Sequence, residues 1–436
     1  MEMMEKPKRS RFFQRPGTKT GWWAAGLTIL SIVMLTINNL GLNPFEKLMD
    51  VNPIPLRIYD FIMMGSLLGG IILGIIALTS KRERSWMIWL FMIPLLFFGI
   101  FLIVALFERL TYDTRVEVAP TPDLSIERVP VIFDDDGSPD GTSALLYLLS
   151  NPYVDLQMVS VSYGEAHPRV FIQHLGRVLE QYGYGDVPLG AGQDAPLSGN
   201  NAFPDFVREG SNGFWGFGPE EPEQKYVAQD SAKLMVQLIN QTDEPITILA
   251  TGALTNLAQA LRLDPDITEN IAAVYIMGGA VNVPGNLNDL VPDTENTFAE
   301  WNIYADPLAA SEVFNSGLNL YLLPLDATNS IQVNANDIAQ WRKGGNIPDF
   351  AADIYDSLME AWGVDEVEMW DLVTAEIMMN PEHCTFTPLR LEVVIEEGQA
   401  EGQTRVVEGK ANVNVCLEPD SEAIKETLSQ VFSSRK

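Results

Sequence analysis

The segment from Phe133 to Leu146 constrains the fold of this chain most, because four acidic residues fall where a strand should give way to a helix. It reads Phe-Asp-Asp-Asp-Gly-Ser-Pro-Asp-Gly-Thr-Ser-Ala-Leu-Leu and follows an apolar run that begins at Val129. Open α/β sheets bind ligands at the carboxyl ends of their strands. Carboxylates crowded there repel one another unless a cation or a polar substrate lies among them. We therefore interpret the segment as a binding site, and the plainer alternative is an acidic turn that caps a helix.

From residue 129 onward, apolar strand-like runs alternate with runs of helical spacing. The runs typical of strands are Leu156–Val161, Val187–Leu189, Ile246–Ala250, Val274–Met277 and Leu318–Leu323. The runs of helical spacing are Pro168–Tyr182, Ser231–Asn240, Asn256–Leu263 and Pro307–Phe314. Residues 192–226 are rich in Gly, Pro, Asn and aromatic residues and indicate a long loop. The alternation predicts an α/β domain, with a mostly parallel sheet and helices on both faces.

Charge is distributed unevenly along the chain. Residues 1–110 contain 12 of the 28 Lys and Arg residues and 7 of the 58 Asp and Glu residues, so the remainder carries 16 basic and 51 acidic residues. Such an acidic body excludes nucleic-acid binding by phosphate neutralisation, and it favours divalent cations.

The two cysteines, Cys384 and Cys416, fit neither a zinc cluster nor a redox motif with two residues between the thiols. A disulfide outside the cytosol is one interpretation, and two unpaired buried thiols are the other. The sequence leaves both open.

Three long uncharged runs precede the acidic domain, namely Trp22–Leu42, Phe61–Ser80 and Ser85–Phe107. Each is about long enough to cross a bilayer core of roughly 30 Å as a helix. Tryptophans lie near the ends of these runs, as in the aromatic belts of membrane proteins, and glycines in the second run would let helices pack closely. The runs predict three transmembrane helices, against the alternative of buried helices in a soluble domain.

Basic residues set the expected orientation of these helices. They concentrate in the tail 1–21 and in the loop Lys81-Arg82-Glu83-Arg84, which places both in the cytoplasm. Residues 22–107 would then form the membrane region, 108–128 a linker, and 129–436 a domain on the extracytoplasmic side. The sequence thus predicts a multi-pass membrane protein.

Four stretches of the acidic domain carry a family resemblance through their order and spacing. They are Asp134, Asp136 and Asp140 after the first strand; Ala250-Thr251-Gly252-Ala253-Leu254-Thr255-Asn256; Met277-Gly278-Gly279 with Gly285-Asn286, Glu300-Trp301-Asn302 and Asp306-Pro307; and Trp370-Asp371. Across roughly residues 129–430 the chain resembles the inosine–uridine-preferring nucleoside hydrolase family. The three uncharged runs lie outside this match.

The resemblance implies a Rossmann-like fold, a bound Ca²⁺ and hydrolysis of a nucleoside to ribose and free base. By position, Asp136 would bind calcium and act as general base toward its water, with Asp371 and the backbone carbonyl of Thr255 as further ligands. All are oxygen donors, which this hard cation requires. Ribose and base would be held by Asp140, Asn286, Glu300, Asn302, Met277 and Trp301. Because family members commonly oligomerise, a homo-oligomer is also an expectation.

Each of these residues also has a plainer structural interpretation. Asp140 and Thr255 could cap the helices that follow them. Met277 and Trp301 would more often be core residues than pocket residues. The segment Leu287–Ala299 is acidic and indicates a flexible loop over the site. The ordered series of motifs, rather than any single residue, favours the site.

One departure from the family pattern concerns the cation. The family's fourth aspartate, expected to bind calcium through its carboxylate, is Gly141 here. Loss of an anionic ligand should weaken Ca²⁺ binding. Asp134, Asp135 or a water could compensate.

Two further departures concern the substrate. The histidine expected as leaving-group acid is Trp370 here, which could instead stack on a base. The family's Gly-Asn after the second strand is Gly164-Glu165, and Glu165 could contact ribose or supply the missing charge. His167 is either a replacement acid or, more simply, a surface residue.

Two functions from different classes follow. The first is a membrane-anchored, Ca²⁺-dependent nucleoside hydrolase, and its substrate could also be another N-riboside. The second is a catalytically weak domain that binds a nucleoside or related riboside and signals through the membrane helices. An intact Ca²⁺ site favours the enzyme, which is the function we expect.

Overall fold

The computed structural model describes residues 127–217 and 226–433, together with a few positions within 19–27 and 72–79. The chain divides into two compact units, Met1–Arg115 and Val116–Lys436. Nearly all of the three runs expected to span a membrane, at 22–42, 61–80 and 85–107, lies outside the described residues. Within the described positions, no helix has both the length and the apolar character needed to cross a bilayer.

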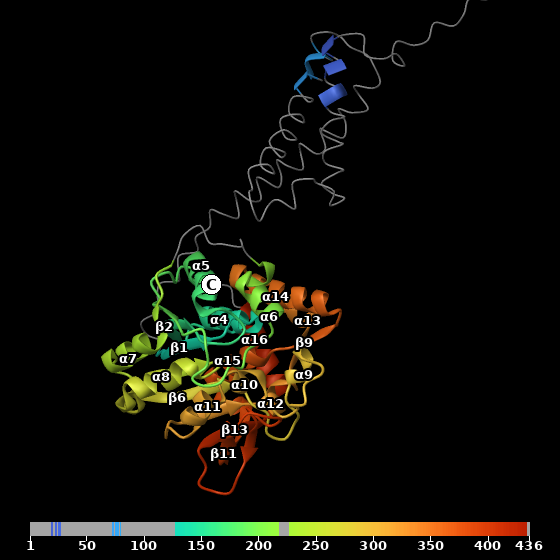
Figure 1. Ribbon diagram of the computed structural model, residues 1–436. Coiled ribbons are helices and arrows are strands. Elements are labelled where there is room, and N and C mark those ends of the chain that lie inside the picture. The colour runs from blue at the N-terminus through green and yellow to red at the C-terminus, as the bar shows by residue number, and fades with distance from the viewer. Residues whose placement is uncertain are drawn as a thin grey trace, which may run out of the picture. The chain divides into compact units, whose positions relative to one another are not determined.

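A nine-stranded sheet forms the centre of the second unit (Figure 1), in the order β10-β13-β7-β6-β5-β1-β2-β3-β4. The strands are β1 Val129–Asp135, β2 Val154–Val161, β3 Leu189–Ala191, β4 Gln229–Asp230, β5 Ile246–Ala250, β6 Ile271–Met277, β7 Leu320–Leu323, β10 Cys384–Leu389 and β13 Val413–Pro419. Every neighbouring pair is parallel except β10 with β13. The carboxyl ends of the parallel strands therefore share one edge, and β1 ends there with two aspartates.

Helices cover both faces of the sheet (Figure 1). One face packs on α4 Pro139–Ser150, α5 Pro168–Gln181, α13 Ala335–Trp341, α14 Asn346–Trp362, α15 Trp370–Met379 and α16 Ser421–Ser433. The other packs on α7 Ser231–Gln241, α8 Thr255–Leu263 and α11 Pro307–Phe314. Val131 and Phe133 contribute to the first core and Ile132 to the second, because side chains alternate across a strand. Burial of these two apolar layers is the main force that holds the sheet and helices together.

Shorter elements surround this layered core. They are α6 Asp205–Asn212, α9 Leu287–Leu290, α10 Trp301–Ala305, α12 Leu325–Thr328, the 3₁₀ turns η3 Phe214–Gly216, η4 Pro265–Asn270 and η5 Pro381–His383, and two antiparallel pairs, β8 Gln332–Asn334 with β9 Glu366–Glu368 and β11 Leu391–Val393 with β12 Thr404–Val406. The region 192–226, expected to be a loop, contains α6. The segment Leu287–Ala299 contains α9 and is anchored by Asn296, whose Nδ2 donates to the Glu401 carbonyl at 2.7 Å.

Cys384 on β10 and Cys416 on β13 form a disulfide, with Cα atoms 5.9 Å apart. The bond joins the antiparallel edge strand to its neighbour, and it decides between the two interpretations of the cysteines. Replacing both cysteines with serine should lower the free energy of unfolding by about 2–4 kcal/mol, because the cross-link restricts the unfolded chain. Denaturant unfolding of the oxidised wild type and the double variant measures this, and equal stabilities would contradict it.

Glu376 is a buried carboxyl group within α15. Its Oε1 lies 2.9 Å from both Asn380 Nδ2 and His383 Nδ1, while Oε2 is buried without a partner. Burial raises the pKa of Glu376 to about 9. The folded state therefore binds this proton more tightly than the unfolded state, and ionisation of Glu376 costs stability increasingly as pH rises from about 4.5 toward 9.

Glu376→Gln should accordingly raise the free energy of unfolding at pH 8 by roughly 1–3 kcal/mol, and change it much less at pH 5. Thermal unfolding of both proteins at the two pH values tests this prediction. The same difference at both pH values would show that ionisation of Glu376 is not the cause.

Candidate active site

The carboxyl end of β1 turns into α4 through a tight junction. Gly137 has a φ of 105°, a conformation that favours glycine and lets the chain change direction. Ser138 caps α4, its Oγ accepting from the Gly141 N–H at 2.6 Å. Asp134 accepts from Ser160 Oγ and from Asn256 Nδ2, which ties β1 to β2 and α8. The capping role is therefore filled by serine, which leaves the aspartates of this junction for other contacts.

Asp136 lies in a slot between two glycines. A Cβ on Gly252 would lie 2.4 Å from the Asp136 Cβ, and a Cβ on Gly164 would lie 2.1 Å from Asp136 Oδ2. Because any other residue would place a Cβ there, both loops can approach Asp136 this closely only as glycine. The Glu165 N–H donates to Asp136 Oδ2 at 3.2 Å, and Asp136 is 1% exposed. Asp136 is thus deeply buried and held in one place.

Asp140 and Asp371 are brought together by α4 and α15. Asp140 Oδ2 accepts from the backbone N–H of Asp371 at 2.6 Å, and its Oδ1 accepts from the hydroxyl of Tyr355 on α14. Asp371 Oδ2 accepts from Ser138 Oγ at 2.8 Å. The N-terminus of α15, where backbone N–H groups are unpaired, therefore faces the Asp140 carboxylate.

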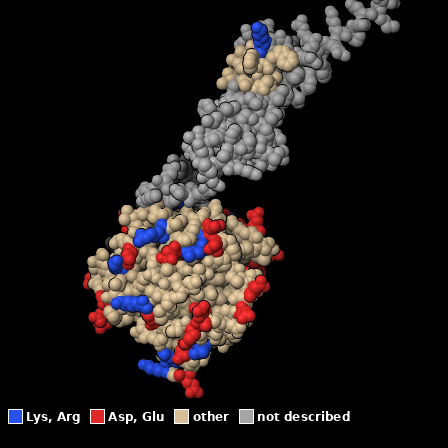
Figure 2. All heavy atoms as spheres, in the orientation of Figure 1, with Lys and Arg blue, Asp and Glu red and all other residues tan. Residues whose placement is uncertain are grey.

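The buried carboxyl groups of this site have no basic side chain as an ion-pair partner among the described residues. Among the described residues, the ion pairs formed by Lys, Arg and His involve other acids than Asp135, Asp136, Asp140 and Asp371. Burial raises the pKa of Asp135 to about 7 and that of Asp140 to about 6, and it raises the pKa of Asp136 and Asp371 well above the usual range. The acidic side chains visible in Figure 2 differ from these buried groups, because they are exposed and basic side chains lie among them. Buried, unpaired carboxylates of this kind require protons or a cation.

A second group of the predicted residues meets at the end of β6. Glu300 precedes α10, and its carboxylate accepts from three backbone N–H groups, those of Gly279 and Asn302 at 2.8 Å and that of Ile303 at 3.2 Å. Asn302 Nδ2 donates to the backbone carbonyls of Met277 at 3.2 Å and Thr251 at 3.3 Å. The ends of β5 and β6 are therefore joined through Asn302.

Asn286 and Trp301 lie next to this group. Asn286 Oδ1 accepts from the Trp301 backbone N–H at 3.1 Å. The Trp301 side chain is buried and stacks on Phe203, with ring centroids 4.5 Å apart. Trp301 therefore contributes packing at the position where the resemblance implies a pocket wall.

Met277 and Trp370 pack together with Ala280 and Leu325. Met277 is buried, whereas Trp370 is partly exposed and donates from Nε1 to Asn329 Oδ1 at 2.7 Å. Trp370 directly precedes Asp371 in α15. The Trp370 indole thus packs against Met277, and it occupies the position where the family pattern has a histidine.

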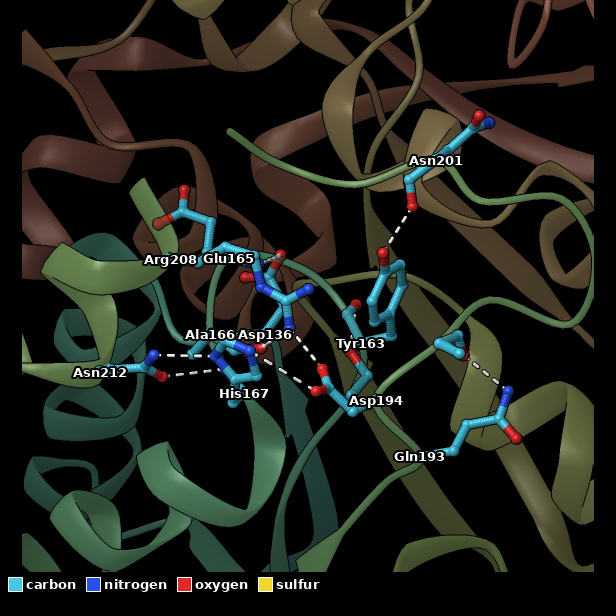
Figure 3. Close-up of polar contacts among 12 residues, drawn as sticks. Asp136, Tyr163, Glu165, Ala166, His167, Gln193, Asp194, Asn201, Arg208 and Asn212 are labelled. Carbon is cyan, nitrogen blue, oxygen red and sulfur yellow. Dashed lines mark hydrogen bonds and ion pairs between the residues drawn. The ribbon is translucent and has the colours of Figure 1, made fainter. Parts of the chain in front are cut away.

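Glu165 follows β2 in the loop that contacts Asp136 (Figure 3). Burial, together with the negative charges of Asp135 and Asp140, raises the pKa of Glu165 to about 8. Ser211 Oγ donates to its Oε2 at 3.5 Å. The Glu165 side chain therefore belongs with the acidic groups, as expected for a residue that supplies charge there.

The His167 side chain, unlike that of Glu165, is directed toward Asn212 and Asp194 (Figure 3). Its Nδ1 lies 2.8 Å from Asn212 Nδ2, and its Nε2 lies 3.6 Å from Asp194, which also pairs with Arg208. The imidazole is 43% exposed. The structure thus places His167 in a partly exposed polar network and does not bring it to the acidic groups.

Thr251, rather than Thr255, faces the acidic groups. Thr251 directly follows β5, and its Oγ1 donates to Asp135 Oδ1 at 2.9 Å. Thr255 is the first residue of α8, and its hydroxyl donates to Asp306 Oδ2 at 2.8 Å. A carbonyl at that position accepts a hydrogen bond within its own helix. The Thr255 hydroxyl is therefore directed to Asp306.

The domain matches a known protein family. The model described as inosine-uridine preferring nucleoside hydrolase matches residues 131–426. The chain belongs to the inosine-uridine preferring nucleoside hydrolase family. A pyrimidine-specific ribonucleoside hydrolase of Citrobacter koseri is 30% identical over 315 residues, which cover 69% of this chain and 97% of that protein.

Solved structures share the fold of this hydrolase. A plant nucleoside hydrolase aligns with a TM-score of 0.63 and 24% identity, covering 70% of this chain and 99% of its own. A purine-preferring ribonucleoside hydrolase from Gardnerella vaginalis aligns with a TM-score of 0.62 and 21% identity, covering 70% and 98%. The expected fold, the family and the enzyme class of nucleoside hydrolase are confirmed. The predicted membrane region lies outside the matched residues.

The family resemblance implies a cation, which would need several oxygen ligands. Among the described residues, no three His, Cys, Asp or Glu side chains lie close enough together to hold a metal ion as they stand. The donor chemistry nevertheless fits, since Asp135, Asp136 and Asp371 offer only oxygen atoms and are buried. A Cβ on Gly141 would also lie 1.8 Å from Asp135 Oδ1. The Asp135 carboxylate therefore occupies the space that a side chain at position 141 would need. The oxygen donors of these residues therefore fit a hard divalent cation by their chemistry.

Several site residues were not assigned by the motif comparison. Asp135 is the middle of three consecutive aspartates, and only the strand register shows which way it points. Tyr355 reaches Asp140 from 215 positions away in the sequence, and no local pattern predicts that contact. Thr251 lies within the motif Ala250–Asn256, but the calcium ligand expected from that motif was Thr255.

Proposed function

We propose that this hydrolase cleaves the N-glycosidic bond of nucleosides to ribose and free base, with Asp136 as the base toward the attacking water. The observation that carries this proposal is the burial of Asp136 between Gly164 and Gly252. Burial, then the negative charge of Glu165, raises the pKa of Asp136 well above its usual range. A carboxylate with a raised pKa is a stronger base near neutral pH than an exposed one.

Ribose is proposed to bind between Asp140 and the group formed by Asn286, Glu300 and Asn302. The acceptor oxygens of Asp140 and Glu300 are already oriented by backbone N–H groups. A carboxylate has about four lone-pair sites, so each retains capacity for a sugar hydroxyl. Groups fixed in this way favour positioning and electrostatic stabilisation, which supply much of the rate in hydrolysis of this type.

The proposal includes a Ca²⁺ ion held by oxygen atoms of Asp136 and Asp371. When bound there, Ca²⁺ makes it easier to remove a proton from a water molecule beside Asp136. Asp136 accepts that proton at a carboxylate oxygen, and the cation offsets the buried negative charge described above. The partly exposed Trp370, packed on Met277, offers a surface on which the base stacks.

We also propose that the N-terminal region anchors the hydrolase domain to a membrane, with the domain on the extracytoplasmic side. The uncharged runs and their basic flanks support the anchor. The Cys384–Cys416 disulfide supports the location, since such bonds persist in oxidising compartments. Protease added to intact cells should remove the domain, and a protected domain would contradict this location.

The test of the proposed reaction is ribose release by the full-length chain, purified in detergent, from a panel of purine and pyrimidine nucleosides. We expect release from at least one nucleoside, and more with Ca²⁺ than with a chelator. Equal release in both conditions would contradict the role of calcium. Nucleoside binding without ribose release would favour a riboside-binding sensor over an enzyme.

A further inference from the structure

We infer that Asp135 supplies a carboxylate to the cation site in place of the aspartate that the family carries at the position of Gly141. The inference rests on the proposed function, because the cation site is the one proposed there. It assigns a role to a residue that lies outside the aligned aspartates of the family pattern. It also explains how this chain tolerates glycine at position 141.

The first step is a steric exchange between the two positions. An ideal Cβ on Gly141 would lie 1.8 Å from Asp135 Oδ1 and 2.6 Å from Asp135 Cγ. Real Cβ atoms do not approach other heavy atoms this closely, since such overlap is strongly repulsive. Asp135 in its observed conformation and any side chain at position 141 therefore exclude each other, and the carboxylate of one replaces that of the other.

The second step is the orientation of the Asp135 carboxylate. Asp135 is fully buried at the end of the interior strand β1. Its Oδ1 accepts from Thr251 Oγ1 at 2.9 Å, and its Oδ2 accepts from the Gly137 N–H at 2.9 Å. Each oxygen makes one hydrogen bond and retains a lone pair. The carboxylate is therefore held in place with acceptor capacity left for a cation.

The third step is the position of Asp135 relative to the assigned acidic groups. Gly141 N–H donates to Ser138 Oγ at 2.6 Å, and Ser138 Oγ donates to Asp371 Oδ2 at 2.8 Å. Asp135 thus lies directly against Gly141, and Asp371 is connected to Gly141 through the Ser138 hydroxyl. Asp135 lies among the proposed ligands, as a replacement must.

Asp134 is the other aspartate that could compensate, and its contacts argue against it. Its Oδ1 accepts from both Ser160 Oγ and Asn256 Nδ2, which connect β1 to β2 and α8. Ser160 is paired with Asp134 in the parallel register of β1 and β2. Asp134 Oδ1 therefore joins β1 to its neighbours, and Oδ2 is buried without a partner among the described residues, while Asp135 points to the opposite face of the sheet.

The test measures Ca²⁺ affinity of the full-length chain by calorimetry, with ribose release followed in parallel. Asp135→Asn keeps the shape of the side chain and should weaken Ca²⁺ binding by at least ~100-fold. Asp186→Asn removes an exposed aspartate and should leave the affinity unchanged. Gly141→Asp alone should also weaken binding, because its Cβ collides with Asp135.

The double variant Asp135→Ala with Gly141→Asp gives the decisive result, since it moves the carboxylate to the position used by the family. We expect it to recover affinity to within ~10-fold of the wild type. Wild-type affinity in Asp135→Asn, or no recovery in a double variant that circular dichroism shows to be folded, would overturn the inference. Calcium binding that depends on Asp135 without ribose release would support the inference and overturn the proposed reaction. Ribose release without Ca²⁺ binding by the wild type would overturn the inference and the proposed calcium site, and it would leave the proposed hydrolysis in place.

Discussion

Asp136→Asn is expected to reduce ribose release by ~10²–10⁴-fold, the usual contribution of a general base. Asparagine has nearly the same shape, so it should still fit between Gly164 and Gly252, but its amide cannot accept a proton from water. Because Asp136 is proposed to act on the water rather than to hold the sugar, nucleoside binding should persist. Steady-state rates and calorimetric binding of the same variant separate the two effects.

Asp186→Asn serves as the control, because it removes one negative charge from an exposed loop position. It should leave both the rate and the binding unchanged. Full activity in Asp136→Asn would refute the base assignment. Loss of nucleoside binding together with activity would instead assign Asp136 to substrate binding.

Gly252→Ala is expected to reduce activity by about 10²-fold and the free energy of unfolding by about 1–3 kcal/mol. The new Cβ would lie 2.4 Å from the Asp136 Cβ and 2.9 Å from the Asp136 backbone nitrogen. Relief of that overlap has to move either β1 or the loop after β5, and both carry site residues. Rate measurements and denaturant unfolding of the same protein test the two parts of the prediction.

Gly185→Ala is the matched control for this substitution. A Cβ there would lie 3.6 Å from its nearest neighbour, Glu180, which is ordinary van der Waals contact. It should change neither activity nor stability appreciably. Unchanged activity in Gly252→Ala would mean that Asp136 does not depend on the close approach of this loop.

Much of the sheet could be predicted from the sequence, because buried parallel strands appear as short apolar runs. The strand expected at Ile246–Ala250 and the helix expected at Pro307–Phe314 have the bounds of β5 and α11. The predicted strand began at Val274, three residues after the start of β6. The apolar run of β6 begins with Ile271–Ala273, directly after a 3₁₀ turn. Helix α6 was missed because Gly, Asn and Ser lower its helical propensity.

Site residues that directly follow a strand in the sequence could be predicted. Contacts between residues that are far apart in the sequence could not be predicted as well. Asp140 and Asp371 come together through α4 and α15, where the Asp371 backbone N–H donates to Asp140. The direction in which Asp135 points depends on the register of β1, which a run of three aspartates cannot show. The contact between Tyr355 and Asp140 depends on how α14 packs on α4, and this is a property of the tertiary structure.

The measurement that tests the central claim most directly is the amount of each product formed from one nucleoside. The full-length chain would be incubated with uridine or inosine in buffer with Ca²⁺, with phosphate present or absent. The account predicts free ribose and free base in equal amounts, independent of phosphate and nearly abolished in Asp136→Asn. Ribose phosphate as the product, or no cleavage by a folded chain that binds the nucleoside, would contradict it.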